Sequence, residues 1–186
     1  MLLGLDISTS ITGATILDKD GEIIYNEAWD TRKFKNMFSK ASFIKDRLLD
    51  AFEHSLDNST TIESIFIEQN LQSFRSGFSS AKTLSALSKF NGVVSWMCYD
   101  SLDIQPEYIA APTARKLAGL KIPRGTKAKE VVLKHVEEMG WLEIEYTKHG
   151  NPKPQFYDRA DSIIIAKAGH YLIQENMKNE SPKDSR

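Results

Sequence analysis

The sequence predicts an α/β fold in which a mixed β-sheet is flanked by α-helices. Three segments with strand character open the chain, and helical and strand patterns then alternate. Three consecutive strands followed by such an alternation imply a mixed sheet with helices packed against it. The 186 residues are 41% hydrophobic and 26% charged, the composition of an ordinary globular domain that is long enough to bury a core.

The first three strands are predicted at residues 2–8, 12–17 and 22–29. Ser and Thr residues separate the first two strands, and the stretch "DKDG", which ends at Gly21, suits a hairpin turn before the third. A helix is predicted over residues 38–56, because its apolar residues recur at helical spacing.

The rest of the chain alternates between strand and helix and then ends in three helices. "IESIFIE" has a strand pattern that stops at Glu68, and residues 79–99, rich in Ala, Leu and Ser, predict a helix. The remaining predicted elements are a short strand at 106–111 and helices at 113–118, 127–139 and 157–173.

One domain is expected over residues 1–174, followed by a polar, flexible tail over 175–186. Cys98 is the single cysteine, which excludes an intramolecular disulfide and fits a reducing, cytoplasmic compartment. No apolar run approaches the ~20 residues that cross a bilayer, and the N-terminus lacks the pattern of a secretion signal, so no membrane partner is expected. The net charge is -1, so a site for a polyanion must come from local clustering.

Four carboxylates fall near the ends of three predicted elements. Asp6 lies within the first strand among apolar residues, and Glu68 ends the fourth strand. Asp158 and Asp161 are three residues apart at the start of the last helix and therefore share a face. Gathered carboxylates repel one another unless a cation lies between them, and hard cations such as Mg²⁺ take oxygen ligands. Two such ions about 4 Å apart can hold the attacking and leaving oxygens of a phosphodiester.

Each carboxylate also has a structural interpretation. Asp6 can accept hydrogen bonds from the Ser/Thr-rich turn that follows it, and Glu68 can be a solvated residue at a strand end. Asp158 and Asp161 can complement the dipole of their helix in its first turn. The four residues together, in this order of elements, favour a metal site.

Four sequence blocks in this order resemble RuvC-type Holliday junction resolvases, which belong to the ribonuclease H-like superfamily and include compact viral members as one alternative for this chain. The resemblance spans roughly residues 1–173. The matching blocks are "GLDISTSITGATIL" with Asp6, Thr12 and Gly13, "IEQ" with Glu68 and Gln69, "ARKLAGLKIPRGTKAKEVV", and "DRADSIIIAKA" with Asp158, Asp161 and Ala166.

The resemblance implies a ribonuclease H-like fold and a homodimer that makes two symmetric nicks across a four-way DNA junction. It also implies two Mg²⁺ ions, for which Mn²⁺ can substitute. Carried over residue by residue, the catalytic residues and metal ligands are Asp6, Glu68, Asp158 and Asp161.

One position departs from the family pattern. Family members often carry an aromatic residue three positions after the glutamate, and this chain has Leu71 there. Phe74 and Phe78 lie close by and can stack on bases, or equally can pack beneath the next helix. The departure opens the alternative of a nuclease with a broader choice of branched DNA.

A basic segment lies between the second and the last acidic motif. Residues 115–134 hold seven Lys and Arg against one Glu, a net charge of +6 in a chain of net charge -1. Such clustering suits phosphate contacts, although a run of charged residues more often forms a solvated helix face. Lys129 best fits the family's lysine near the active site. The other predicted DNA contacts in the segment are Arg115, Lys116, Arg124 and Lys127.

The helix at 79–99 is the candidate dimer helix. Its small residues permit close helix approach, and the family's homodimer favours this role, while ordinary core packing explains the same residues. Three other functions remain as alternatives. They are an actin-like nucleotide-binding fragment, a DNA-binding homologue without catalysis, and a ribonuclease H-like nuclease for RNA/DNA hybrids.

Overall fold

The structure is a computed structural model that describes residues 1–55, 61–69 and 81–180. The order of its elements confirms the prediction: three strands, a helix, a strand, a helix, a strand and three helices. The strands are β1 (Leu2–Asp6), β2 (Ile11–Leu17), β3 (Ile23–Asp30), β4 (Ser64–Glu68) and β5 (Glu107–Ile109). The helices are α1 (Met37–Ser55), α2 (Ala81–Leu102), α3 (Ala111–Leu117), α4 (Ala128–Glu138) and α5 (Gln155–Glu180).

The strands form one mixed sheet in the order β3-β2-β1-β4-β5. β1, β2 and β3 pair antiparallel, as consecutive hairpin strands do. β4 then pairs with the free edge of β1, and β5 pairs with β4, both in the parallel direction. Parallel neighbours need a crossover connection, and α1 and α2 supply the two crossovers. The predicted mixed sheet flanked by helices is therefore confirmed.

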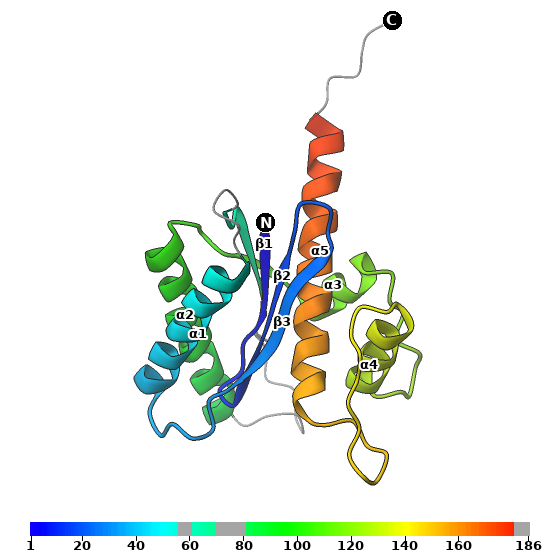
Figure 1. Cartoon of the computed structure of the whole chain (residues 1–186), viewed down its shortest axis with the longest axis horizontal. Helices are drawn as coiled ribbons and strands as arrows, with labels where there is room; N and C mark the ends of the chain where they lie inside the picture. Colours follow the sequence, from blue (N-terminus) through cyan, green and yellow to red (C-terminus); the bar gives the residue numbers. More distant parts are fainter. Residues whose placement is uncertain (56–60, 70–80, 181–186) are drawn as a thin grey trace, which may run out of the picture.

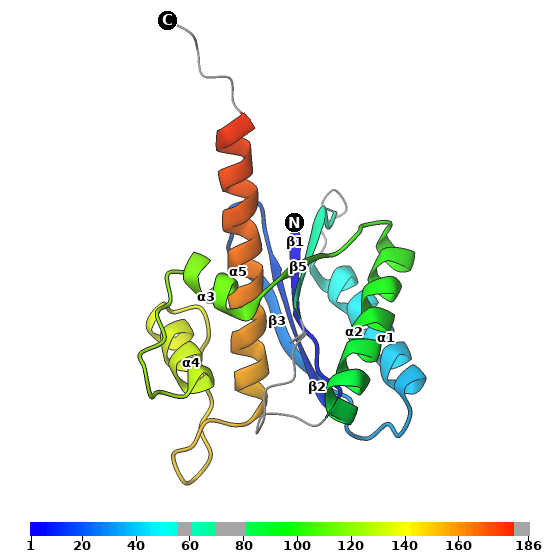
Figure 2. The same ribbon diagram turned by 180° about the vertical axis from the view of Figure 1, so that it is seen from behind.

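Helices cover both faces of this sheet (Figure 1 and Figure 2). α1 and α2 lie on one face, and α3, α4 and α5 lie on the other. Because side chains alternate along a strand, β1 directs Leu3 and Leu5 into the core beneath α1 and α2 and Leu2 into the core beneath α5. The sheet thus separates two hydrophobic cores.

Helix α5 packs very closely against its face of the sheet. A Cβ added at Gly4 would lie 2.6 Å from the backbone nitrogen of Ala166. A Cβ added at Gly169 would lie 2.3 Å from the ring of Phe66. Glycine at one side of each contact therefore lets helix and strand approach where any other residue would collide.

The last helix is longer than the sequence pattern predicts. It begins at Gln155 and ends at Glu180, whereas the apolar periodicity predicts residues 157–173. The extra residues at its C-terminal end include Gln, Glu, Met and Lys, which favour helix without needing an apolar face. The division into a domain at 1–174 and a flexible tail at 175–186 stays a prediction, and residues 181–186 lie outside the described part.

Candidate active site

Asp6 and Glu68 end two neighbouring parallel strands. The register pairs Leu5 with Ile67, and Asp6 and Glu68 are the next residues along β1 and β4. Neighbouring strands lie about 4.8 Å apart, and residues at the same register point to the same face. That face is the one under α5, because Phe66, two residues before Glu68, packs against α5. The sheet therefore places two carboxylates side by side beneath the start of α5.

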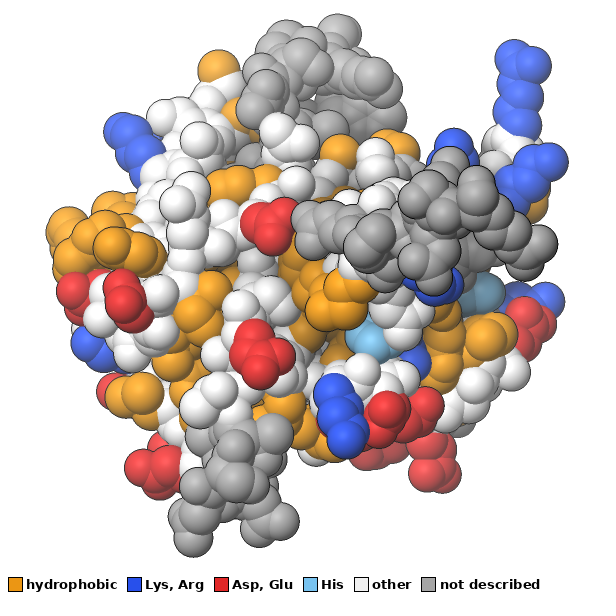
Figure 3. All heavy atoms as spheres, turned by 90° about the horizontal axis from the view of Figure 1, so that it is seen from above, with side chains coloured by type: hydrophobic (Ala, Val, Ile, Leu, Met, Phe, Trp, Pro, Cys, Tyr) orange, Lys and Arg blue, Asp and Glu red, His pale blue; other side chains and the backbone are white. Residues whose placement is uncertain are grey.

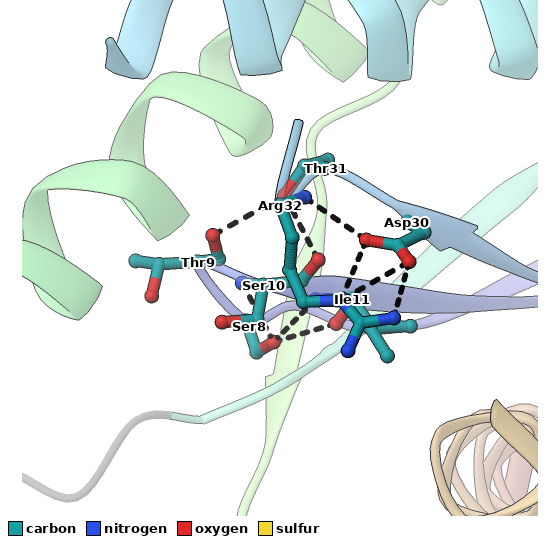
Figure 4. Close-up of polar contacts among 7 residues, drawn as sticks. All are labelled: Ser8, Thr9, Ser10, Ile11, Asp30, Thr31 and Arg32. Carbon is teal, nitrogen blue, oxygen red and sulfur yellow. Dashed lines mark hydrogen bonds and ion pairs between the residues drawn. The ribbon is translucent and has the colours of Figure 1, made fainter. Parts of the chain in front are cut away.

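A hydrogen-bonded loop holds the end of β1 (Figure 4). The Ser8 hydroxyl donates to the Ile11 carbonyl at 2.6 Å and accepts from the Ile11 N–H at 3.0 Å. The Thr31 hydroxyl, after β3, donates to the carbonyls of Thr9 and Ser10 at 3.2 and 3.1 Å. These bonds pair polar groups of the turn with one another and with Thr31, and none of them involves the carboxylate of Asp6. The Ser/Thr-rich turn therefore does not account for Asp6.

Gly13 allows the start of α5 to pack beside Asp6. It pairs with Asp6 across β1 and β2. A Cβ at Gly13 would lie 2.0 Å from the carbonyl oxygen of Asp158. The backbone of α5 therefore rests directly on β2 beside Asp6, and its first two turns carry Asp158 and Asp161. Their side chains are only 15% and 7% exposed.

Two basic side chains approach the carboxylates from α3 and α4. The ammonium nitrogen of Lys129 lies 3.6 Å from Asp158 Oδ1 and 3.4 Å from Asp161 Oδ2. Arg115 acts electrostatically on both Glu68 and Asp161. The structure thus brings together the four predicted carboxylates and two of the predicted basic residues.

The pKa values of the four acids reflect this crowding. Burial raises the pKa of Asp6 well above its ordinary value, and Glu68 and Asp161 raise it further. Burial and Asp161 raise the pKa of Glu68 to about 7. Burial raises the pKa values of Asp158 and Asp161 as well, while Lys129 opposes the shift at both. The site accumulates more negative charge than its own cations neutralise.

For Lys129 the surroundings favour the charged form of the side chain. Burial lowers the pKa of its ammonium, but Asp161, Asp158 and Asp6 outweigh this effect and the net pKa lies above the ordinary value. Lys129 is therefore held in its charged form by the carboxylates that it contacts.

The donor set fits a hard divalent cation in its chemistry. It offers carboxylate oxygens only, on two strand ends and a helix, and a bound cation would offset the repulsion that raises their pKa values. As the side chains stand, the described residues include no group of three or more Asp, Glu, His or Cys close enough to hold a metal ion. Lys129 supplies positive charge to this arrangement instead.

The other predicted DNA contacts lie farther out. Lys116, Arg124 and Lys127 are exposed, and Lys127 forms an ion pair of 2.8 Å with Glu130. No interaction among the described residues links these three side chains to the four carboxylates. Phe74 and Phe78 lie outside the described residues.

Arg32 is a neighbour that the sequence did not indicate. It follows β3, and its guanidinium forms hydrogen bonds with Asp30 (Figure 4). The pKa of Arg32 is raised chiefly by Asp30, with a smaller attraction from Asp158. The pairing of Ile11 with Asp30, together with the hydrogen bonds from Thr31 to Thr9 and Ser10, brings this residue to the end of the sheet that holds Asp6.

The raised pKa of Glu68 gives the stability of the protein a pH dependence. The unfolded chain releases this proton near pH 4.5 and the folded chain near pH 7, so the free energy of unfolding falls as pH rises through that window. We expect Glu68→Gln to remove part of this fall and to stabilise the protein at pH 8 by on the order of 1 kcal/mol. Urea unfolding at pH 5 and pH 8 with chelator measures the effect. Glu107→Gln, at an exposed glutamate of β5, is the matched control, and equal pH profiles for all three proteins would contradict the expectation.

Comparison with known proteins gives a match at the level of fold. No protein-family model matches the sequence, and no curated protein matches it. Two solved structures of Thermus thermophilus RuvC match almost the whole chain. One, RuvC in complex with Holliday junction substrate, has a TM-score of 0.64 at 14% identity and covers 94% of each chain. The other has a TM-score of 0.60 at 17% identity and covers 94% of this chain and 96% of that one.

The fold is that of RuvC. The resemblance of the sequence motifs is therefore confirmed for the fold, and the RuvC-like sheet is the frame on which the four carboxylates meet. Within the described residues, no helix has both the length and the apolar character needed to cross a membrane.

Proposed function

We propose that this protein is a metal-dependent, structure-selective DNA endonuclease that nicks four-way junctions as a homodimer. One observation carries the proposal: four carboxylates from three elements converge at one edge of a RuvC-like sheet, with Lys129 among them. The structural neighbour in complex with Holliday junction substrate supports branched DNA as the partner.

Asp6, Glu68, Asp158 and Asp161 would hold the metal. When bound, Mg²⁺ or Mn²⁺ supplies charge neutralisation and an activated water for attack on the phosphorus. The chain supplies rigidity, because Asp6 and Glu68 sit on paired strands and Asp158 on backbone that touches β2. Lys129 and Arg115 can donate hydrogen bonds to phosphate oxygens beside the acids.

A nicking assay tests the proposal. The purified protein is incubated with an end-labelled four-way junction, a linear duplex and an RNA/DNA hybrid, each with Mg²⁺ and with chelator. We expect paired nicks near the branch point only with Mg²⁺. Cleavage of the hybrid alone would move the substrate to RNA, and junction binding without cleavage of any substrate would leave a DNA-binding protein.

Metal binding should also appear as a change in stability. A cation that binds the folded chain and relieves carboxylate repulsion raises the melting temperature as its concentration rises. At 100 times the dissociation constant we expect a gain of about 2.7 kcal/mol, or roughly 5–10 °C for a domain of this size. Thermal unfolding with increasing Mg²⁺ or Mn²⁺ measures the shift, and Asp6→Asn should lose most of it. An equal shift in both proteins would place the binding elsewhere.

We propose that the homodimer forms through the exposed face of α2. Ser88, Gly92, Trp96 and Tyr99 recur there at helical spacing, and Trp96 and Tyr99 are 64% and 49% exposed. Two large aromatic side chains next to small residues suit close packing of a second helix.

Trp96→Glu should therefore yield a monomer, with at least a hundredfold weaker self-association, because it buries a charge at the centre of the contact. Sedimentation velocity measures the change. Met139→Glu replaces another exposed apolar residue, 51% exposed at the end of α4, and should leave the dimer intact. A monomeric wild-type protein would contradict the proposed dimer.

A further inference from the structure

We infer that a lysine-lined groove between α1 and α2 binds the backbone of the DNA strand that enters the carboxylate site. This inference rests on the proposed nuclease function and adds a second DNA-binding surface to it. The groove lies on the opposite face of the sheet from the basic segment of α3 and α4, which the sequence singles out.

The groove has the size and lining of a site for a polyanion. Its volume is about 430 Å³, and none of the described residues that line it is acidic. Four lysines line it: Lys35 just before α1, Lys40 in the first turn of α1, and Lys82 and Lys89 on α2. Met37 and other apolar side chains form part of the same lining. Cations above an apolar floor suit the phosphates and sugars of a nucleic-acid strand.

Most of the charge in the groove is available for a ligand. Lys40 donates a hydrogen bond to the Thr9 carbonyl, and no carboxylate in the part of the chain that the structure describes forms an ion pair with it. Lys35, Lys82 and Lys89 are exposed, and no ion pair within residues 1–55, 61–69 and 81–180 joins them to a carboxylate. The first turns of α1 and α2 contain no acidic residue either. A chain with a net charge of -1 therefore concentrates four positive charges at one groove.

The groove adjoins the candidate active site. Thr9, which lines it, follows Asp6 by only three residues, so their Cα atoms lie within about 11 Å of each other. α1, α2 and α5 all begin at the end of the sheet where β1 ends (Figure 1). A strand whose scissile phosphate lies at Asp6 can therefore place neighbouring phosphates in the groove.

Among the described residues, the opposite end of the molecule lacks this concentration of one sign. Figure 3 views that end and shows acidic and basic side chains beside one another. Lys19, in the turn between β2 and β3, is flanked by Asp18 and Asp20. The positive groove is therefore a feature of the catalytic end, where DNA would be bound.

The lysine side chains also indicate that the groove would bind DNA without recognising its base sequence. Its ammonium is a point charge that contacts phosphates without selecting a base. The groove would therefore strengthen DNA binding and orient the strand, with no preference for its base sequence. An acidic protein segment is the competing occupant, and the four lysines favour DNA because the adjacent carboxylates form a site suited to phosphodiester cleavage.

Lysine footprinting of the full chain tests the groove directly. The free protein and its complex with a four-way junction, held in chelator, are acetylated and the modified lysines are quantified by mass spectrometry. We expect at least fivefold protection of Lys35, Lys82 and Lys89 by the junction. Lys19 and Lys178, which are exposed at the other end of the molecule, should react equally in both samples. Equal reactivity of the groove lysines with and without bound junction would overturn the inference.

Paired variants give the second measurement. Lys82→Ala with Lys89→Ala should remove two phosphate contacts and reduce the slope of log affinity against log salt by about 1.8. The ratio of wild-type affinity to variant affinity should then fall about tenfold between 50 and 200 mM salt. Lys19→Ala with Lys178→Ala is the matched control and should keep the wild-type slope.

The outcomes separate this inference from the proposed function. A wild-type protein that nicks the junction while the groove variant keeps the wild-type slope would overturn the groove alone. Protected groove lysines in a protein that cleaves nothing would support the groove and overturn the nuclease. Binding of an acidic peptide that competes with acetylation, with no protection by DNA, would overturn the choice of occupant.

Discussion

Asp161→Asn should abolish nicking of a four-way junction and make the protein more stable. The side chain is 7% exposed and lies 3.4 Å from Lys129, so an amide of the same shape fits the site. Burial raises the pKa of all four carboxyl groups, and the charge of Asp161 raises those of Asp6, Glu68 and Asp158 further, so the amide removes one source of repulsion. Losing a proposed metal ligand should reduce the nicking rate by about a thousandfold or more.

The gain in stability distinguishes a functional carboxylate from a structural one. Without metal, we expect Asp161→Asn to raise the melting temperature by about 2–4 °C, equivalent to about 1 kcal/mol. A residue kept for chemistry in spite of its electrostatic cost shows this trade of stability against activity. Junction affinity in chelator should stay within about twofold of wild type.

Asp46→Asn, at an exposed residue of α1, is the matched control for both measurements. It should nick at the wild-type rate and melt at the wild-type temperature. An Asp161→Asn protein that unfolds more easily and no longer binds the junction would show that Asp161 is structural.

Gly13→Ala should disrupt the site through the backbone. The added Cβ would lie 2.0 Å from the Asp158 carbonyl oxygen, so either β2 or the start of α5 must move. Forcing a methyl group into a backbone contact of this kind costs about 3 kcal/mol or more. The displaced helix start carries Asp158 and Asp161, so nicking should fall by at least a hundredfold even in the fraction that stays folded.

Gly92→Ala provides the matched control for the stability measurement alone, because Gly92 also lies on the proposed dimer face of α2. A Cβ at Gly92 meets no other atom of the described chain within 4 Å, and Gly92 lies inside α2. Replacing a helical glycine by alanine should stabilise the protein by up to about 1 kcal/mol. Urea unfolding measures both variants, and single-turnover nicking compares Gly13→Ala with the wild type. A Gly13→Ala protein with wild-type stability would contradict the contact between β2 and α5.

The sequence could predict the order of elements and the residues that meet at the site. Strand and helix periodicities are local properties, and here they agree with the packing, so every predicted element is present. The acids could be found because each lies near an element end, where a side chain in an α/β fold is free to serve a site. Four such acids in a family-like order made the prediction specific.

Features that depend on pairing between distant segments could not be predicted. The register that sets Asp6 beside Glu68, and the pairing of Asp30 with Ile11 that precedes Arg32, follow from strand pairing that no local pattern encodes. The groove lysines were missed for the same reason. Lys35 and Lys40 are more than 40 residues from Lys82 and Lys89, and only the packing of α1 against α2 joins the two pairs.

Helix α5 also acts as a rigid spacer with one end in the candidate active site. It carries Asp161 near its start and Lys178 near its end, 17 residues later, which corresponds to about 26 Å of helix. Midway, Lys167 donates a hydrogen bond of 2.8 Å to the Gly21 carbonyl and fixes the helix to the hairpin of β2 and β3. A fluorescent label at Lys178 would therefore keep a constant distance from the candidate active site and stay clear of both basic surfaces.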